Sequence, residues 1–280
     1  MQAFAIPHGA PRLLATDLDG TLLRPDGSVS PRTEAALAAA RAAGTEIVFV
    51  TARPHRWLAP LIHLAAGAHG TAICANGASV IDMATLTVLE QRGLTAPAVT
   101  TLVARLRASL GPAARFATES AAGFAREHGY SSISPYPAPP GSPAADRIED
   151  VLPATTLKLL VRTGQTWAVQ RPDEFAARIA EAVGTLATAT SSGIDGLGEI
   201  AAPGVTKAST LAAWATARGI SAEQVWAVGD APNDLPMLAW AGRAFAVANA
   251  HRDVLAAVPH VLPSNADDGV AALLERCAAG

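Results

Sequence analysis

The sequence predicts an α/β fold in which a parallel sheet is interrupted by an inserted α+β segment. Strand and helix patterns alternate from residue 13 to residue 76, and the same alternation resumes from Val205. Between residues 80 and 200, hairpin patterns mix with helices instead. Alternation of this kind is typical of parallel strands joined by right-handed crossovers. We therefore expect a sheet domain formed by residues 1–83 and 202–280 and a second domain formed by residues 84–201.

The elements of the first stretch begin and end at ordinary signals. Ser30 precedes Pro31 and is a typical N-cap, and Gly44 is a typical stop for the alanine-rich helix that follows. Asn76-Gly77 is a turn signal after the third strand. The predicted elements are a strand at 13–17, a helix at 31–44, a strand at 46–50, a helix at 54–66 and a strand at 71–74.

The inserted segment shows weaker and shorter patterns. Residues 80–81 and 87–89 flank a turn and could pair as a hairpin, and residues 134–143 are rich in Pro, Ser and Gly, as loops are. The other predicted elements of the insert are helices at 97–110 and 173–183, a strand at 156–161, and weaker strands near Phe116, near Phe124, at 185–190 and at 197–200.

The regular alternation after the insert completes the sheet domain. The predicted order is a helix at 207–218, a strand at 224–228, a helix at 233–241, a strand at 244–247, a helix at 251–257, a strand at 258–262 and a final helix from Asp268. The two halves of the sheet domain would then meet across the insert.

Composition narrows the classes of partner and compartment. The chain has 280 residues, 50% of them apolar, and a net charge of −3 without a basic run, so binding to nucleic acid or a membrane surface gains no support. Cys74 and Cys277 match no metal or redox spacing, which favours free thiols in a reducing compartment. We find neither a signal peptide in residues 1–12 nor a membrane-spanning stretch, and expect a soluble cytoplasmic protein. The oligomeric state cannot be read from the sequence.

The most informative residues follow the first strand. Asp17 and Asp19 lie two residues apart near its carboxyl end, so both side chains can point to one side. Gly20 lets the chain turn sharply there. A lone Asp-x-Asp is usually a solvated turn, but two carboxylates held close together need a cation or a shared proton.

Other polar residues follow strands or begin helices in the same half of the pattern. In a parallel sheet these positions share one edge, where ligands bind. Taken singly, each of these residues could have a purely structural role, as a turn hydroxyl, a surface cation or a helix cap. The group comprises Thr51, Arg53, Lys207, Asp230, Asn233 and Asp234.

Together, these residue types favour phosphate chemistry. Clustered carboxylates suit Mg²⁺, which takes few protein oxygens and leaves room for a substrate phosphate. Lys207, helix N-termini and possible contacts from Arg53 suit the charge of the phosphate. One carboxylate can act as a nucleophile while its neighbour serves as general acid and then general base.

The ordered motifs resemble those of the haloacid dehalogenase superfamily of phosphohydrolases. They are Asp17-Leu18-Asp19-Gly20-Thr21, then Thr51, then Lys207, then Gly229-Asp230 with Asn233-Asp234. The long insert is similar to the C2-type cap of the Cof-like branch, as are the phrases around Asn76 and Lys207. The resemblance covers the whole chain and implies a Rossmann-like core, residues 1–83 and 202–280, with the cap at 84–201.

The resemblance also implies a role for each residue. Asp17 would attack phosphorus, and Asp19 would protonate the leaving oxygen and later activate water. Mg²⁺ would be held by the Asp17 carboxylate, the Asp19 main-chain oxygen and Asp230, with Asp234 in support. Thr51 and Lys207 would bind the transferring phosphoryl group, with Lys207 as the third catalytic residue, and Asn233 would support the phosphoryl oxygens and the metal. Arg53 is a further candidate for substrate binding, from its position beside Thr51.

These roles predict a Mg²⁺-dependent phosphatase that acts on a small phosphorylated metabolite, such as a sugar phosphate, through an aspartyl-phosphate. A phosphomutase on the same scaffold is the nearest alternative. A signalling receiver domain also clusters aspartates and a lysine, although the insert and the early double aspartate argue against it. A metabolite-binding protein without catalysis is a further alternative, and a screen of phosphate esters would separate these.

Overall fold

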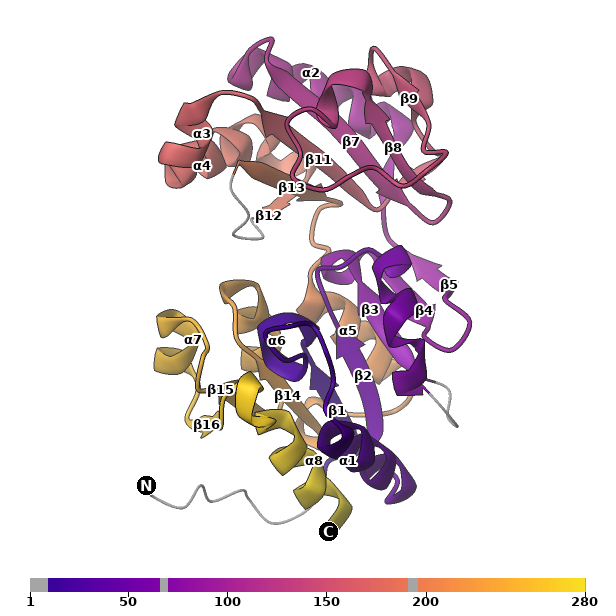
Figure 1. Ribbon diagram of the computed structural model, residues 1–280, viewed down its shortest axis with the longest axis vertical. Coiled ribbons are helices and arrows are strands. Elements are labelled where there is room, and N and C mark those ends of the chain that lie inside the picture. The colour runs from indigo at the N-terminus through magenta and orange to yellow at the C-terminus, as the bar shows by residue number, and fades with distance from the viewer. Residues whose placement is uncertain (1–9, 66–69, 191–195, 280) are drawn as a thin grey trace. The chain divides into compact units, whose positions relative to one another are not determined.

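The computed structural model describes residues 10–65, 70–190 and 196–279 (Figure 1). The chain divides into two compact units. The core unit comprises residues 1–53, 57–87 and 206–280, and the insert unit comprises residues 54–56 and 88–205. The exact boundaries proposed above, 1–83 with 202–280 and 84–201, stay a prediction.

The core unit is built on one eight-stranded sheet in the order β16-β15-β14-β1-β2-β3-β4-β5. Pairing is parallel from β16 to β3, and β4 then runs antiparallel to β3. β1 lies in the middle, where Leu13 pairs with both Val225 of β14 and Glu46 of β2. The strands are β1 (Leu13–Thr16), β2 (Glu46–Val50), β3 (Thr71–Cys74), β4 (Ser79–Asp82), β5 (Thr87–Gln91), β14 (Val225–Gly229), β15 (Arg243–Val247) and β16 (His260–Leu262).

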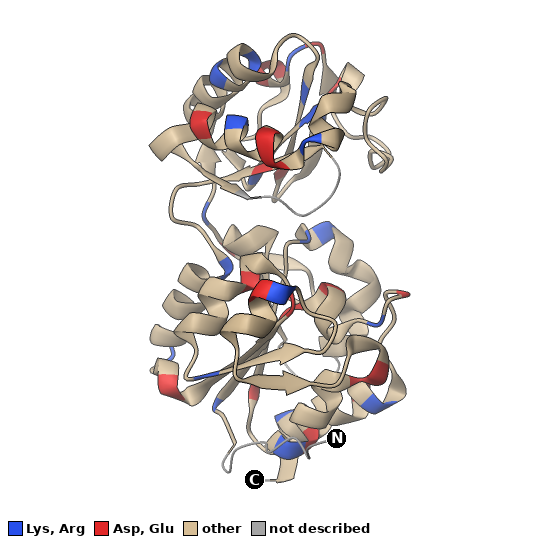
Figure 2. Cartoon of the chain, turned by 90° about the vertical axis from the view of Figure 1, so that its left-hand side faces the viewer, with Lys and Arg blue, Asp and Glu red and all other residues tan. Residues whose placement is uncertain are grey.

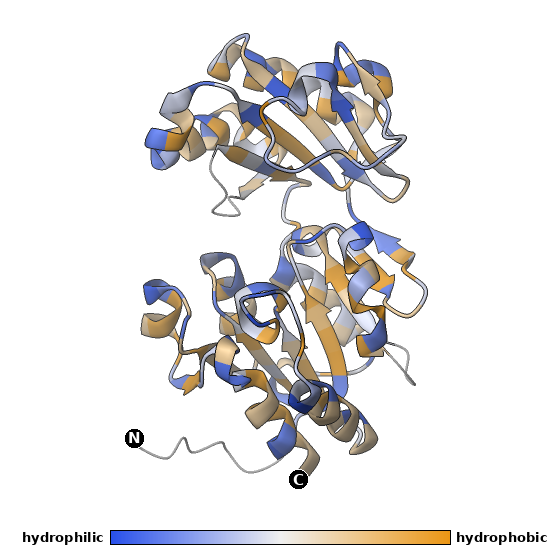
Figure 3. Ribbon diagram, viewed as in Figure 1, coloured by the Kyte–Doolittle hydropathy of each residue, from blue (hydrophilic) through white to orange (hydrophobic). Residues whose placement is uncertain are grey.

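The central strands of this sheet are apolar because both faces are covered. Every residue of β1 is buried, as are the five residues of β14. Continuous apolar strands are expected where helices pack on both sides of a parallel sheet. Figure 3 shows these strands in the colours of hydrophobic residues.

Helices of the core unit begin at the signals seen in the sequence. Ser30 caps α1 by accepting a hydrogen bond from the Thr33 amide at 3.0 Å, and Pro31 takes the first helical position. α1 and α8 lie side by side although they come from opposite ends of the chain (Figure 1). The helices are α1 (Pro31–Ala42), α5 (Lys207–Thr216), α6 (Leu235–Trp240), α7 (Arg252–Ala257) and α8 (Gly269–Ala279).

Two predicted elements differ from the structure. The helix expected at 54–66 is a run of 3₁₀ turns over His55–Ala65, and Pro60, which has no amide hydrogen, lies inside it. The strand expected at 156–161 is two strands, β10 (Thr155–Thr156) and β11 (Lys158–Thr163), which pair with different neighbours. Local patterns do not reveal which neighbour a strand will find.

The insert unit has a six-stranded sheet in the order β12-β13-β11-β7-β8-β9 and a small pair, β10-β6. The sheet is antiparallel except at β8-β9. An α+β unit thus interrupts the Rossmann-like core, as predicted. Its other elements are β6 (Leu94–Thr95), β7 (Ala114–Ser120), β8 (Gly123–Glu127), β9 (Ala144–Ala145), β12 (Thr188–Thr190), β13 (Leu197–Ala201), α2 (Ala96–Leu110), α3 (Thr166–Gln170) and α4 (Pro172–Val183).

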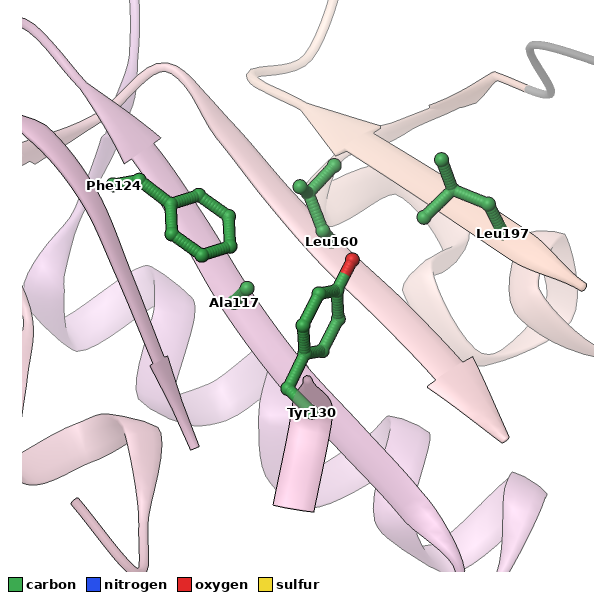
Figure 4. Close-up of a cluster of buried hydrophobic side chains, with 5 residues drawn as sticks. All are labelled: Ala117, Phe124, Tyr130, Leu160 and Leu197. Atoms are coloured by element: carbon green, nitrogen blue, oxygen red, sulfur yellow. The ribbon is translucent and has the colours of Figure 1, made fainter. Parts of the chain in front are cut away.

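A small apolar cluster lies on one face of the insert sheet. Phe124 and Tyr130 meet edge to face, with ring centroids 6.1 Å apart. Figure 4 shows these two rings in front of the strands, with helices drawn behind them. The cluster consists of Ala117, Phe124, Tyr130, Leu160 and Leu197.

Charged residues of both signs are interspersed over the two units (Figure 2). Within the described ranges, every helix falls short of the length or the hydrophobicity that crossing a lipid bilayer requires. Cys74 and Cys277 are both buried free thiols, and burial raises the pKa of each.

Candidate active site

The turn after β1 places Asp17 at the carboxyl end of the core sheet. The Asp17 amide donates to the Val228 carbonyl at 3.0 Å, which ties this position to β14. Gly20 then adopts a φ of +79°, and a Cβ atom at this position would collide with the Asp230 carboxylate. Glycine therefore permits both the turn and its close approach to Asp230.

A buried lysine joins two carboxylates from different loops. α5 begins at Lys207, and Thr206 caps it by accepting from the Ser209 amide at 3.1 Å. The Lys207 ammonium donates to Asp17 Oδ1 at 2.6 Å and to Asp234 Oδ1 at 2.7 Å. Both of these carboxylate groups are also buried.

The loop after β14 fixes the other acidic side chains. Asp234 Oδ2 accepts hydrogen bonds from the Asp230 and Ala231 amides, each at 3.1 Å, so both of its oxygens have donors. Asp230 Oδ1 accepts from the Thr21 hydroxyl at 2.7 Å. Thr21 therefore positions an acidic residue, a role that sequence reasoning did not assign to it.

The cluster contains three acidic side chains and only one basic side chain, so its negative charges are not fully compensated. Asp17, Asp230 and Asp234 each offer an oxygen within 4.8 Å of the others. Burial raises the pKa of the Asp17 carboxyl well above its usual value; Lys207 opposes this rise and Asp234 adds to it. Burial also raises the pKa of Asp230, against the hydrogen bond from Thr21. Such a group favours a cation as its further partner.

Asp19 lies outside this cluster of three carboxylates. Its side chain is 56% exposed and accepts from Arg53 through both oxygens, Oδ2 from Nε at 2.8 Å and Oδ1 from a terminal nitrogen at 2.5 Å. Thr51 is buried, and its hydroxyl oxygen accepts from the Arg53 amide at 3.0 Å. Asp19, the predicted general acid and base, thus forms a bidentate ion pair with Arg53, a predicted substrate-binding residue.

Asn233 connects the acidic loop to the segment at Asn76-Gly77, to which the sequence assigns no site role. Its Nδ2 donates to Asn76 Oδ1 at 3.2 Å. Asn76 is buried and has a φ of +56°. The Asn-Gly pair signalled the turn, but not that the Asn76 side chain would contact Asn233. Asn249, likewise unassigned from sequence, donates to the Gly20 carbonyl at 2.7 Å.

The core unit therefore brings the predicted residues together in two neighbouring groups. Asp17, Lys207, Asp230 and Asp234 form the buried cluster, whereas Asp19 and Arg53 form the more exposed pair. Asn233 and Thr51 lie in loops that carry members of these groups. The catalytic, substrate-binding and metal-binding roles of these residues stay predictions.

A family model described as haloacid dehalogenase-like hydrolase matches residues 14–274. The chain belongs to this family. The resemblance drawn from the ordered motifs, including the Cof-like branch with its inserted cap, is confirmed, and so is the prediction of a hydrolase enzyme.

Individual relatives cover almost the whole chain. The pyridoxal phosphate phosphatase YbhA of Escherichia coli K12 is 28% identical over 268 residues, which are 93% of this chain and 96% of that one. A solved Streptococcus mutans structure has a TM-score of 0.81 at 22% identity, covering 97% of this chain and all of that chain. A haloacid dehalogenase-like hydrolase from Bacteroides thetaiotaomicron has a TM-score of 0.77 at 23% identity, with coverages of 94% and 98%. These two structures confirm the fold.

Proposed function

We propose that this hydrolase is a Mg²⁺-dependent phosphatase that acts on a small phosphorylated metabolite through an aspartyl-phosphate on Asp17. The observation that carries the proposal is the buried contact of Lys207 with both Asp17 and Asp234. An ammonium there both orients the Asp17 carboxylate and supplies positive charge for phosphoryl oxygens. The named phosphatase among the relatives supports this activity.

The donor set of the cluster fits Mg²⁺. Three carboxylates against one ammonium leave two negative charges, which a divalent cation balances. Asp17 Oδ2 and Asp230 Oδ2 accept no hydrogen bond from the part of the chain that the structure describes, so these two residues would hold the ion. Asp234 would orient the loop, and Asp19 would add its main-chain oxygen. Bound Mg²⁺ would stabilise the negative charge on the phosphoryl oxygens.

The reaction would proceed in two displacements on this chain's residues. An Asp17 oxygen attacks phosphorus, and the bond from phosphorus to the ester oxygen breaks as Asp19 gives that oxygen a proton. Asp19 then takes a proton from water, and the water oxygen displaces the Asp17 carboxylate to release orthophosphate. The exposed position of Asp19 gives it access to both the leaving group and water.

The remaining predicted residues would bind the phosphoryl group. Thr51 and Asn233 offer a hydroxyl and an amide, and Lys207 offers its charge. In the structure the Arg53 guanidinium donates to the Asp19 carboxylate. To bind the substrate, Arg53 would therefore have to release Asp19 and donate to the phosphate instead. A planar guanidinium suits bidentate contact with either a carboxylate or a phosphate.

The substrate class is a small phosphate ester. Pyridoxal phosphate, named in the description of the Escherichia coli relative, belongs in a test panel beside sugar phosphates. Free orthophosphate would distinguish hydrolysis from a mutase reaction, and tight binding without turnover would indicate a binding protein. Location in the cytoplasm stays a prediction.

The Asp17→Asn variant tests this function. Asparagine keeps the shape of the side chain but removes the nucleophilic carboxylate, so we expect orthophosphate release to fall at least about 1000-fold. Wild type and variant would be compared on an aryl phosphate and on the ester panel, with added Mg²⁺. Wild-type rates in Asp17→Asn, or no release by the wild type on any ester, would overturn the proposal.

A further inference from the structure

A three-residue segment between β3 and β4 contacts several of the loops that carry predicted phosphoryl-binding residues. Ala75, Asn76 and Gly77 have successive φ values of +53°, +56° and +105°. This left-handed region costs a residue such as alanine about 1–3 kcal/mol and persists only where the surroundings enforce it. Strain of this kind concentrates at functional sites.

On one side, the backbone of this segment holds the loop after β2. The Ala75 amide donates to the Arg53 carbonyl at 2.9 Å, and the Asn76 amide donates to the Thr51 carbonyl at 3.1 Å. Thr51 and Arg53 are the predicted phosphate-binding residues of that loop. Their main chain is therefore tied to the strained segment rather than left free at the end of a strand.

On another side, the segment packs against the start of α5. The Thr210 hydroxyl donates to the Gly77 carbonyl at 2.8 Å. A Cβ atom at Gly77 would collide with the Thr206 carbonyl, so the backbones approach as closely as glycine allows. Thr206 is the cap residue immediately before Lys207.

The Asn76 side chain supplies the third connection, to Asn233. Its Oδ1 accepts from Asn233 Nδ2 at 3.2 Å, and the side chain is buried. Asparagine tolerates the left-handed conformation and offers a side-chain oxygen without adding charge. Aspartate would meet the first two requirements but would bring another anion close to the acidic cluster.

We propose that Asn76 is a positioning residue that fixes the Asn233 amide, and with it the phosphoryl-binding side of the site. The proposal rests on the phosphatase function argued above. Asn76 acts through Asn233 and does not itself contact the reacting atoms. The strained backbone is what carries its side chain to that partner.

The Asn76→Gly variant separates this role from the backbone role. Glycine adopts a φ of +56° without strain, so the variant keeps the backbone conformation and removes the whole side chain, including its amide. Leu86→Gly is the matched control, because Leu86 has a φ of +57° in the turn between β4 and β5. We expect kcat/KM for an aryl phosphate to fall about tenfold in Asn76→Gly, the loss of one oriented hydrogen bond, and to stay unchanged in Leu86→Gly.

A double-mutant cycle with Asn233→Ala tests whether the effect passes through Asn233. If it does, Asn76→Gly combined with Asn233→Ala will be no slower than Asn233→Ala alone. The proposal would be overturned if the kcat/KM losses of the two single variants multiplied in the double variant. It would also be overturned if Asn76→Gly kept the wild-type kcat/KM or failed to fold.

An NMR measurement that needs no substrate tests the positioning role of Asn76 separately from the phosphatase assignment. The Asn233 side-chain amide signal, identified in ¹⁵N–¹H spectra by its loss in Asn233→Ala, should shift in Asn76→Gly and stay in place in Leu86→Gly. An unmoved signal in Asn76→Gly would reject the positioning role even if the wild type hydrolysed no ester.

Discussion

Lys207 is a buried ammonium whose two hydrogen-bond partners are both buried carboxylates. Burial alone would lower its pKa, but Asp17 and Asp234 outweigh that effect, and the pKa of Lys207 lies above its usual value. The lysine therefore stays charged over the whole working pH range. Its charge compensates the acidic cluster as well as serving the proposed chemistry.

Replacement of this lysine should reduce stability as well as activity. Lys207→Met leaves Asp17 and Asp234 buried without their cation, so we expect the free energy of unfolding to fall by about 3–5 kcal/mol in EDTA. Urea unfolding would measure the loss. Adding Asp17→Asn should restore part of it, because one uncompensated charge is removed. An unchanged unfolding midpoint in Lys207→Met would contradict this account.

At the scale of elements, β11 and β13 of the insert unit share a buried ion pair. Lys158 and Glu199 are paired through Nζ and Oε1, with side chains only 3% and 7% exposed. Their strands are antiparallel neighbours. The desolvation of two buried charges offsets much of their attraction, so we expect the intact pair to add little net stability.

Single and double replacements should therefore behave differently. Lys158→Met leaves Glu199 without its cation and should cost about 3–5 kcal/mol, whereas Lys158→Met with Glu199→Leu should stay within about 2 kcal/mol of the wild type. Chemical unfolding of the full chain would measure both. Equal losses in the two variants would show that the pair itself is strongly stabilising.

Tyr130, beside the same sheet, gives the insert unit a dependence on alkaline pH. Burial raises its pKa to about 12, with Arg162 opposing the rise. Because the unfolded phenol ionises near pH 10, the unfolded state loses a proton that the folded state keeps between about pH 10 and 12. The free energy of unfolding should fall through that window, by about 2 kcal/mol in total.

Two variants check this pH dependence. Tyr130→Phe should remove the Tyr130 part of the slope, measured by chemical unfolding at about pH 9 and pH 11. Tyr136→Phe is the matched control for the loss of a phenol hydroxyl, because that side chain is exposed. The idea fails if Tyr130→Phe changes the slope no more than Tyr136→Phe does.

Elements with strong local signals were predictable, and those that depend on distant neighbours were not. Ser30 and Pro31 mark the start of α1 because a cap is a local interaction. The hairpin signal at residues 80–89 placed β5 beside β4, but nothing local shows that this hairpin belongs to the core sheet rather than to the insert. The order of motifs predicted that Asp17 and Lys207 belong together, but the fork between Asp19 and Arg53 and the bond between Asn76 and Asn233 depend on side-chain directions that no spacing gives.

At the scale of the whole molecule, the acidic cluster links folding to the proposed metal. Without a metal, the carboxylates of the cluster repel one another, which should lower the stability of the folded state. A cation that binds only the folded state would raise that stability by shifting the unfolding equilibrium. We expect saturating Mg²⁺ to raise the melting temperature, corresponding to about 2.7 kcal/mol at a hundredfold excess over Kd, and EDTA to reverse the rise. Asp17→Asn should show a smaller shift. A melting temperature indifferent to Mg²⁺ would argue against the metal site.

β1, a central strand of the core sheet, pairs with one strand that precedes the insert in the sequence and with another that follows it. β1 pairs on one edge with β2, which follows it closely along the chain, and on the other edge with β14, which is synthesised only after the entire insert unit. During translation the insert can therefore fold first, while β1 still exposes an apolar, unpaired edge. We therefore expect a nascent chain stalled before Val225 to expose this unpaired strand edge, the kind of surface that chaperones protect.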